Sequence, residues 1–76
     1  MPDYKIIETE TKGEVHIKVN SQYNNIKATK VVVAENIKVR LYGTIKESLV
    51  IKKGAQVYLH GSIAGKLDNQ GELYIY

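Results

Sequence analysis

The chain has no cysteine, no tryptophan and no phenylalanine, and its single proline is Pro2. Without cysteine it can form neither a disulfide nor a thiolate zinc site. Its two histidines, His16 and His60, stand too far apart to form a recognisable pair of metal ligands. A domain of 76 residues buries only about 60% of its unfolded surface, so its core supplies little stability. Oligomerisation is the remaining common remedy, and we expect a homodimer or a higher homo-oligomer.

Long apolar segments are also missing. No run of apolar residues is long enough to cross a membrane, and the first ten residues lack the apolar centre of a signal peptide. The sequence therefore predicts a cytoplasmic protein without a membrane partner. The net charge of +3 permits an acidic partner without requiring one.

Catalytic patterns are absent from the sequence as well. His60 lies close to Ser62, but no carboxylate is placed to orient the imidazole. The acidic residues are scattered, without the paired spacing of a metal or glycosidase site, and no phosphate-binding loop is present. We expect a protein that is not an enzyme and that uses no cofactor and no metal.

An 18-residue repeat runs through the later part of the sequence. Residues 31–48 align with residues 49–66, so that apolar residues and one glycine recur at matching positions. The matched pairs include Val31 with Leu49, Val39 with Val57, Leu41 with Leu59, Gly43 with Gly61 and Ile45 with Ile63. Residues 67–76 begin a third, shorter copy, in which Leu67 follows Leu49, Leu73 follows Val57 and Ile75 follows Leu59. Apolar residues alternate within each copy, which is the pattern of a half-buried strand.

This period indicates a coil of short strands. A repeat of 16 to 18 residues is too short for a helical unit and suits one turn of a solenoid. The sequence predicts a single all-β domain over residues 1–76, a short β-solenoid (β-helix) of about three 16–18-residue turns. Residues 21–76 form the repeat turns, while residues 1–20, around Thr11-Lys12-Gly13, form a hairpin or a capping strand. The alternative is a small β-barrel, in which regular hairpins would produce the repeat.

The segment LHGSIAGKL, over residues 59–67, carries a resemblance to a known family. It follows the phrase apolar-x-G-x-apolar-x-G-x-apolar and resembles the repeats of the bactofilin-like family, polymer-forming β-helical scaffold proteins of bacteria. The preceding turn has Gly43 and Ile45 but Glu47 in place of the second glycine. The resemblance covers about residues 31–76. It implies a β-helical fold, and more weakly the formation of filaments.

Outward-facing residues of the stacked copies fall into two columns. One column is predicted to hold Tyr23, Tyr42, His60 and Tyr76, and its neighbour holds Arg40, Tyr58 and Tyr74. Tyrosine and arginine are enriched at binding hot spots. Tyrosine is also common in strands that bind nothing, because it is a good strand former. The sequence predicts a protein-binding face made of Arg40, Tyr42, Tyr58, His60 and Tyr74.

The last ten residues predict a second contact surface. An apolar-alternating strand there leaves the edge and the interior of the final turn uncovered, which repeat proteins normally cap. We expect self-association, by a two-fold end-to-end contact, through Leu67, Leu73, Ile75 and Tyr76.

These features favour a non-catalytic protein. The first prediction is a protein-interaction or self-assembling scaffold module, whose partner is itself, another protein, or both. A variant of this role is a small bacterial or phage inhibitor of the immunity type, which blocks its partner by occlusion. The alternative is a single-stranded nucleic-acid-binding small β-barrel, which the basic balance and the aromatic strands would suit.

Overall fold

The polypeptide winds into a coil of short, stacked strands. In the computed structural model, which describes residues 4–76, 73% of the residues lie in strands, none lies in a helix, and the coil makes about four turns. The strands are β1 (Lys5–Ile7), β2 (Thr11–Ile17), β3 (Ser21–Val33), β4 (Lys38–Ile51), β5 (Gln56–Ile63), β6 (Lys66–Asn69) and β7 (Glu72–Ile75). The predicted all-β solenoid is confirmed, with one turn more than expected. The barrel alternative is wrong, because the turns stack along one axis.

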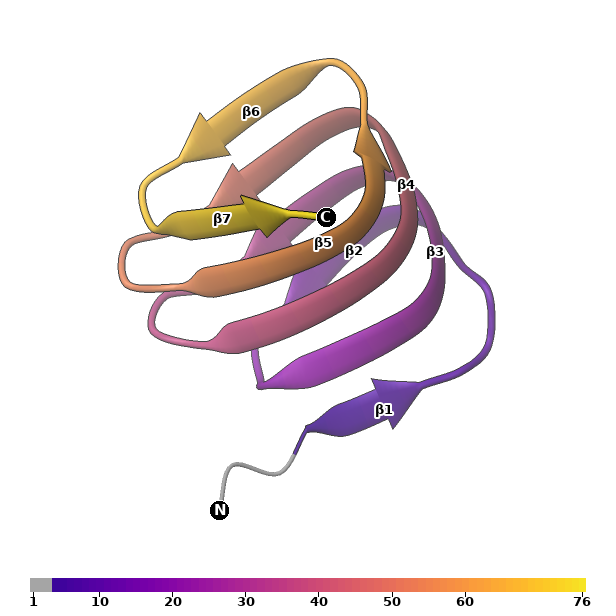
Figure 1. Ribbon diagram of the computed structural model, residues 1–76, viewed down its shortest axis with the longest axis horizontal. Coiled ribbons are helices and arrows are strands. Elements are labelled where there is room, and N and C mark those ends of the chain that lie inside the picture. The colour runs from indigo at the N-terminus through magenta and orange to yellow at the C-terminus, as the bar shows by residue number, and fades with distance from the viewer. Residues whose placement is uncertain (1–3) are drawn as a thin grey trace.

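The coil has two walls joined by a bend (Figure 1). Strands β3 and β4 are long and curve, so that each contributes its first half to one wall and its second half to the other. The first wall has the strand order β1-β3-β4-β5-β7. On the second wall, β2 pairs with the second half of β3, and β6 pairs with the second half of β4. All these pairings are parallel, as stacked turns of one coil require.

Strand register confirms the repeat in the later part of the chain. Strands β4 and β5 pair with an offset of 18 residues, while β5 and β7 pair with an offset of 16. The partners include Val39 with Val57, Leu41 with Leu59, Leu49 with Leu67, Val57 with Leu73 and Leu59 with Ile75. These pairs are the ones that the sequence alignment predicts.

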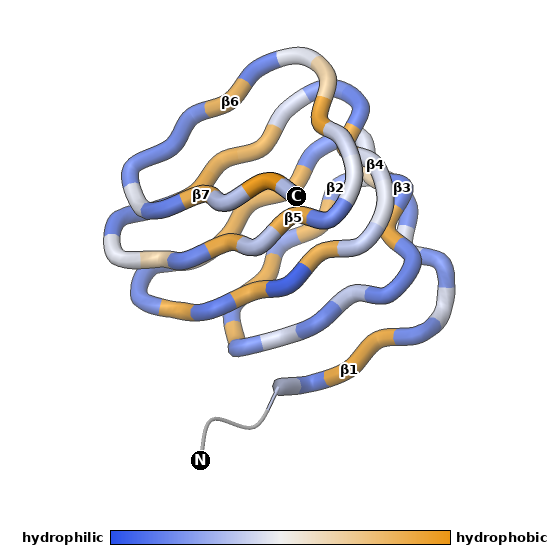
Figure 2. The backbone as a smooth tube through the Cα atoms, in the orientation of Figure 1, coloured by the Kyte–Doolittle hydropathy of each residue, from blue (hydrophilic) through white to orange (hydrophobic). Residues whose placement is uncertain are grey.

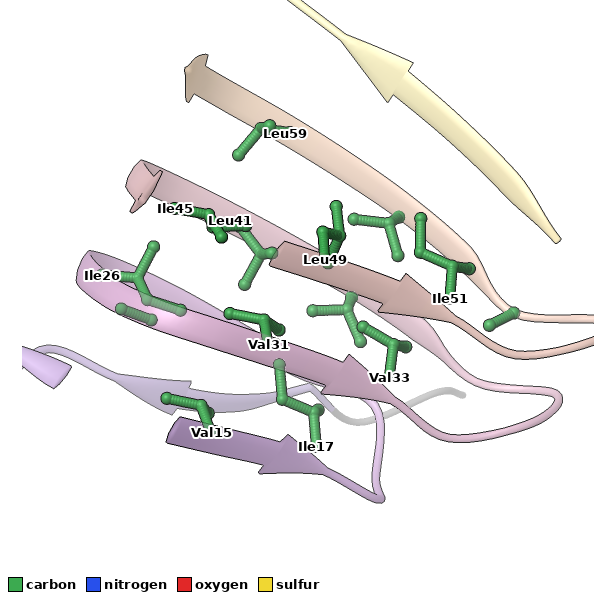
Figure 3. Close-up of a cluster of buried hydrophobic side chains, with 14 residues drawn as sticks. Val15, Ile17, Ile26, Val31, Val33, Leu41, Ile45, Leu49, Ile51 and Leu59 are labelled. Atoms are coloured by element: carbon green, nitrogen blue, oxygen red, sulfur yellow. The ribbon is translucent and has the colours of Figure 1, made fainter. Parts of the chain in front are cut away.

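A continuous apolar core fills the space between the walls. Hydrophobic and hydrophilic residues alternate along the strands (Figure 2). Strand geometry therefore turns the apolar set inward, where it is buried. Among residues 4–76, fourteen apolar side chains are buried, and the larger ones of successive turns meet inside the coil (Figure 3). Burying one such side chain stabilises the fold by about 1.5–3 kcal/mol. Because these residues pack mainly against the turns above and below, the core depends on stacking.

Glycine makes the bend between the walls possible. Gly43 and Gly61 lie one above the other at the bend, with φ of 140° and 152°. A Cβ on Gly43 would overlap the backbone carbonyl oxygen of Ile26, and a Cβ on Gly61 would overlap that of Gly43. A side chain at either position would therefore separate two turns.

The N-terminal segment forms a further turn of the coil. Of the two arrangements predicted for it, the hairpin is wrong, because β1 and β2 each pair in parallel with β3. Thr11-Lys12-Gly13 lies inside β2, although its composition resembles that of a turn. Strand β1 instead covers the edge of the first wall, as a capping strand would.

Tyr23 is the one residue of the predicted columns that the structure places elsewhere. It pairs with Leu41 rather than with Tyr42, because β3 and β4 pair there with an offset of 18 residues and not 19. Its ring packs against the core, and burial raises the pKa of its hydroxyl. The predicted column therefore begins at Tyr42.

Candidate functional site

One outer wall of the coil is covered with aromatic side chains. We call this surface the aromatic face, and it lies on β4, β5 and β7. Strand alternation turns Val39 and Leu41 inward and thereby turns the residues beside them outward. The aromatic face consists of Arg40, Tyr42, Tyr58, His60, Tyr74 and Tyr76. All five residues of the predicted binding face thus lie together.

The rings of the aromatic face stack in two columns. The Tyr42 and His60 rings lie 4.5 Å apart at an interplanar angle of 9°, and the His60 and Tyr76 rings lie 4.7 Å apart at 12°. In the neighbouring column, the Tyr58 and Tyr74 rings lie 5.1 Å apart at 13°. Nearly parallel stacking follows from the register, which places equivalent side chains directly above each other. The stacked rings therefore hold one another in a fixed arrangement on the surface.

Two polar contacts extend the aromatic face. The guanidinium of Arg40 lies over the ring of Tyr4, 5.2 Å from its centre. Tyr4 was not predicted to belong to this surface, because it precedes β1 and lies in neither ring column. At the other end, the hydroxyl of Tyr74 donates a hydrogen bond of 3.2 Å to Glu72, and this bond raises the pKa of Tyr74. Glu72 also accepts a hydrogen bond of 2.9 Å from the side-chain amide of Gln56.

The last turn leaves apolar side chains uncovered. We call β6 and β7, with Tyr76, the open turn. Leu67 is 47% exposed and Ile75 is 56% exposed, whereas Leu49 and Leu59, which precede them in the same columns, are fully buried. Leu73 is half-buried against the core. Of the predicted self-association residues, Leu67, Ile75 and Tyr76 are thus available for contact, and Leu73 is available only in part.

The aromatic face and the open turn share two residues. Tyr74 and Tyr76 complete the two ring columns. Tyr74 lies on β7, the last strand of the first wall, and Tyr76 directly follows that strand. Tyr76 is 68% exposed and presents one side of its ring without a stacked neighbour in the part of the chain that the structure describes. The two surfaces are therefore continuous around one edge of the coil.

A polar hollow of about 400 Å³ lies on the bend side of the first turns. Its lining includes Lys12, Lys27, Lys46 and Glu10. The carboxylate of Glu10 lies 2.9 Å from Lys12 and 3.3 Å from Lys27. The hydrogen bonds from these lysines hold the pKa of Glu10 below its ordinary value. The carboxylate of Glu10 thus neutralises part of the positive charge of these lysines.

Neither a metal-binding cluster nor a membrane-spanning helix is present in residues 4–76. In that range, no three His, Asp or Glu side chains gather where they could share a metal ion. The same range has no helix of the length and apolarity that crossing a bilayer requires.

Comparisons of the chain with protein-family models, with curated proteins and with solved structures found no match. What it shares with the bactofilin-like repeats is the parallel, β-helical arrangement of stacked turns.

Proposed function

We propose that this chain is a non-catalytic, self-associating interaction module. Its contact surface with other copies is the open turn, and the aromatic face is its surface for a protein partner. The observation that carries the proposal is the exposure of Leu67 and Ile75, in columns whose preceding members are fully buried. A further strand on this edge would bury both side chains and pair the free backbone groups of β6 and β7.

Self-association through the open turn is tested by placing a charge there. We expect Ile75→Lys to fold as the wild type does, since the side chain is 56% exposed, and to lower the average mass in solution. Sedimentation velocity at matched concentrations measures this mass. The control is Val50→Lys, which adds the same charge at a half-buried position on the middle turn. Equal association of the two variants would contradict the role of the open turn.

The aromatic face supports the second part of the proposal. Stacked rings beside an arginine form the kind of rigid, amphipathic surface on which hot spots concentrate. Occlusion of a foreign protein, as an inhibitor would act, uses the same surface. Because Tyr58 and His60 lie on β5 and not on the open turn, we expect Tyr58→Ser and His60→Ser to leave self-association unchanged. Loss of association in these variants would mean that the two surfaces do not act separately.

Single-stranded nucleic acid is the less favoured partner. The hollow between Lys12, Lys27 and Lys46 is the basic feature closest to such a role, but Glu10 is paired with two of its lysines. Phosphate contacts would make binding to a labelled oligonucleotide weaken steeply as the salt concentration rises.

A further inference from the structure

The two ends of the coil carry matching side chains. Each outward column continues from turn to turn, and one of them contains, in order, Glu14, Lys30, Ser48 and Lys66. If a second copy continued the coil, its β2 would follow β6 on the second wall. The same column would then place Glu14 of the next copy beside Lys66 of the first. These opposite charges would attract across the contact.

The two neighbouring columns match as well. One runs through Val15, Val31, Leu49 and Leu67, so Leu67 would be covered by Val15 of the next copy. The other runs through His16, Val32, Val50 and Asp68, so Asp68 would lie beside His16 of the next copy. The register thus pairs one apolar residue with another and gives both charged residues of β6 a polar partner.

Glu14 already shows that its column favours alternating charge. Its carboxylate lies 2.6 Å from Nε2 of His16. The positive charge of Lys30, its register partner on the next turn, also attracts it. Both influences lower the pKa of Glu14, which keeps the carboxylate ionised. In the continued coil, Glu14 would lie between two lysines, Lys30 of its own chain and Lys66 of the neighbouring copy.

On the first wall, two strands compete for one place. In the first turn β1 precedes β2 along the chain, and in the last turn β7 follows β6. When β2 of the next copy pairs with β6 of the first, β1 of the next copy would therefore occupy the same level of the stack as β7 of the first. Only one of these two strands can pair with the first half of β3 in that copy.

Strand β1 is the weaker of the two competitors. It has three residues, none of which belongs to the buried core. Ile6 is 58% exposed, and Lys5 places a charged side chain in the inward column beside Ser21. Strand β7 in its place would put Leu73 beside Ser21 and Ile75 beside Tyr23, which are apolar side chains in inward columns. The exchange would replace a charged residue by leucine at that position.

We propose that copies of this chain stack head to tail, with β6 pairing with β2 of the next copy and β7 displacing its β1 from β3. Strand β1 is then a cap that occupies the docking site in the free chain. This proposal rests on the self-association proposed above and specifies its geometry. Each contact joins two different ends, so the assembly is open and grows into a filament rather than stopping at a dimer.

Charge exchange across the contact is the first test. Lys66→Glu and Glu14→Lys each place like charges at the contact, and we expect each variant to associate about tenfold more weakly than the wild type. Both residues are exposed, so both variants should fold. In an equimolar mixture, every contact between the two different variants joins opposite charges, so an alternating assembly is favoured. The mixture should recover the wild-type mass distribution in sedimentation velocity, although neither variant does so alone.

Locking the cap is the second test. Ile6 and Gln22 are register partners on β1 and β3, and neighbouring strands are close enough for a disulfide. The chain has no other cysteine, so Ile6→Cys with Gln22→Cys gives one defined bridge. The oxidised protein should remain monomeric, and reduction should restore association. Association of the oxidised protein at the wild-type level would contradict the displacement of β1.

The outcomes separate this geometry from self-association itself. If Glu14→Lys has no effect while Lys66→Glu or Ile75→Lys disrupts the assembly, the contact joins two open turns with two-fold symmetry. The head-to-tail arrangement would then be wrong, and the proposed function would stand. A wild-type protein that is monomeric at every concentration would overturn both.

Discussion

At the scale of single residues, the bend of the coil depends on backbone contact between turns. The backbone of Gly61 rests directly on that of Gly43, and Gly43 rests on Ile26. A strand could not turn this corner at the normal spacing of about 4.8 Å if a Cβ stood between the two backbones. The glycine that recurs at positions 43 and 61 is thus a steric requirement for stacking these turns.

Substituting this glycine should destabilise the fold. We expect Gly61→Ala to lower the free energy of unfolding by roughly 2 kcal/mol, because the new Cβ meets a carbonyl that cannot move alone. Urea denaturation measures the change. The control is Gly13→Ala, which also has a positive φ, of 78°, but whose Cβ would meet no atom within 4 Å. Equal losses in the two variants would show that strain at positive φ, and not the contact between turns, accounts for the effect.

Glu10 links the first two turns through charge. The pKa of Glu10 is lower in the folded chain than its ordinary value. The ionised carboxylate therefore stabilises the fold at pH values above that ordinary pKa. This stabilisation is lost as the pH falls through the folded pKa. We therefore expect Glu10→Gln to lose less stability in acid than the wild type.

A carboxyl titration followed by NMR checks this directly. The pKa of Glu10 should lie below that of an isolated glutamate and should rise in Lys27→Met, which removes the contact at 3.3 Å. An unchanged pKa in that variant would show that Lys27 does not contribute.

At the scale of strands, the aromatic columns connect β4, β5 and β7. Rings in register stack whether or not the surface binds a partner. The columns therefore also help to hold the turns together. The stack of Tyr42, His60 and Tyr76 spans three successive strands of the first wall. The surface proposed to bind a partner would thus also stabilise the coil.

A double-mutant cycle measures the stabilising part. We expect Tyr42→Ala and His60→Ala to show a coupling of about 0.5–1 kcal/mol in the free energy of unfolding, because their rings stack at 4.5 Å. The control cycle combines Tyr42→Ala with Tyr58→Ala, whose rings belong to different columns. A coupling of zero in the first cycle would mean that the stack adds nothing to stability.

The pairing of the strands from β4 onward could be predicted from the sequence, whereas the pairing of β1, β2 and β3 could not. In the later part, valine, leucine and isoleucine recur in the inward columns, so the 18-residue offset is visible. Earlier, polar Ser21 occupies an inward position and the register shifts between β3 and β4, which breaks the pattern. Thr11-Lys12-Gly13 imitates a turn inside β2. Tyr23 was assigned to the wrong side of its strand because it pairs with Leu41, one residue before the Tyr42 that it matches in the sequence.

The aromatic face was predictable for the same reason. Its residues lie on β4, β5 and β7, where the repeat sets the register without ambiguity. The contact of Arg40 with Tyr4 and the lysine hollow both involve the first turn, which the repeat does not reach. The placement of these side chains could thus be predicted as far as the periodicity of the core extends, and their role in binding stays a prediction.

At the scale of the whole molecule, the coil is a stack with two unlike ends. The first end has β1, whose side chains are largely exposed, and the last end has the open turn with its exposed leucine and isoleucine. Growth by stacking would cover the open turn and lengthen both walls. The aromatic face lies on the side of the stack, so it would repeat along an assembly and could bind a partner at several places.

The most direct test of this account is the solution mass of the wild-type chain as its concentration is raised. Light scattering behind a sizing column gives this mass without reference to shape. The account predicts a mass that exceeds the 8.6 kDa of one chain and increases with concentration. A mass that stays at 8.6 kDa up to the limit of solubility would contradict self-association through the open turn.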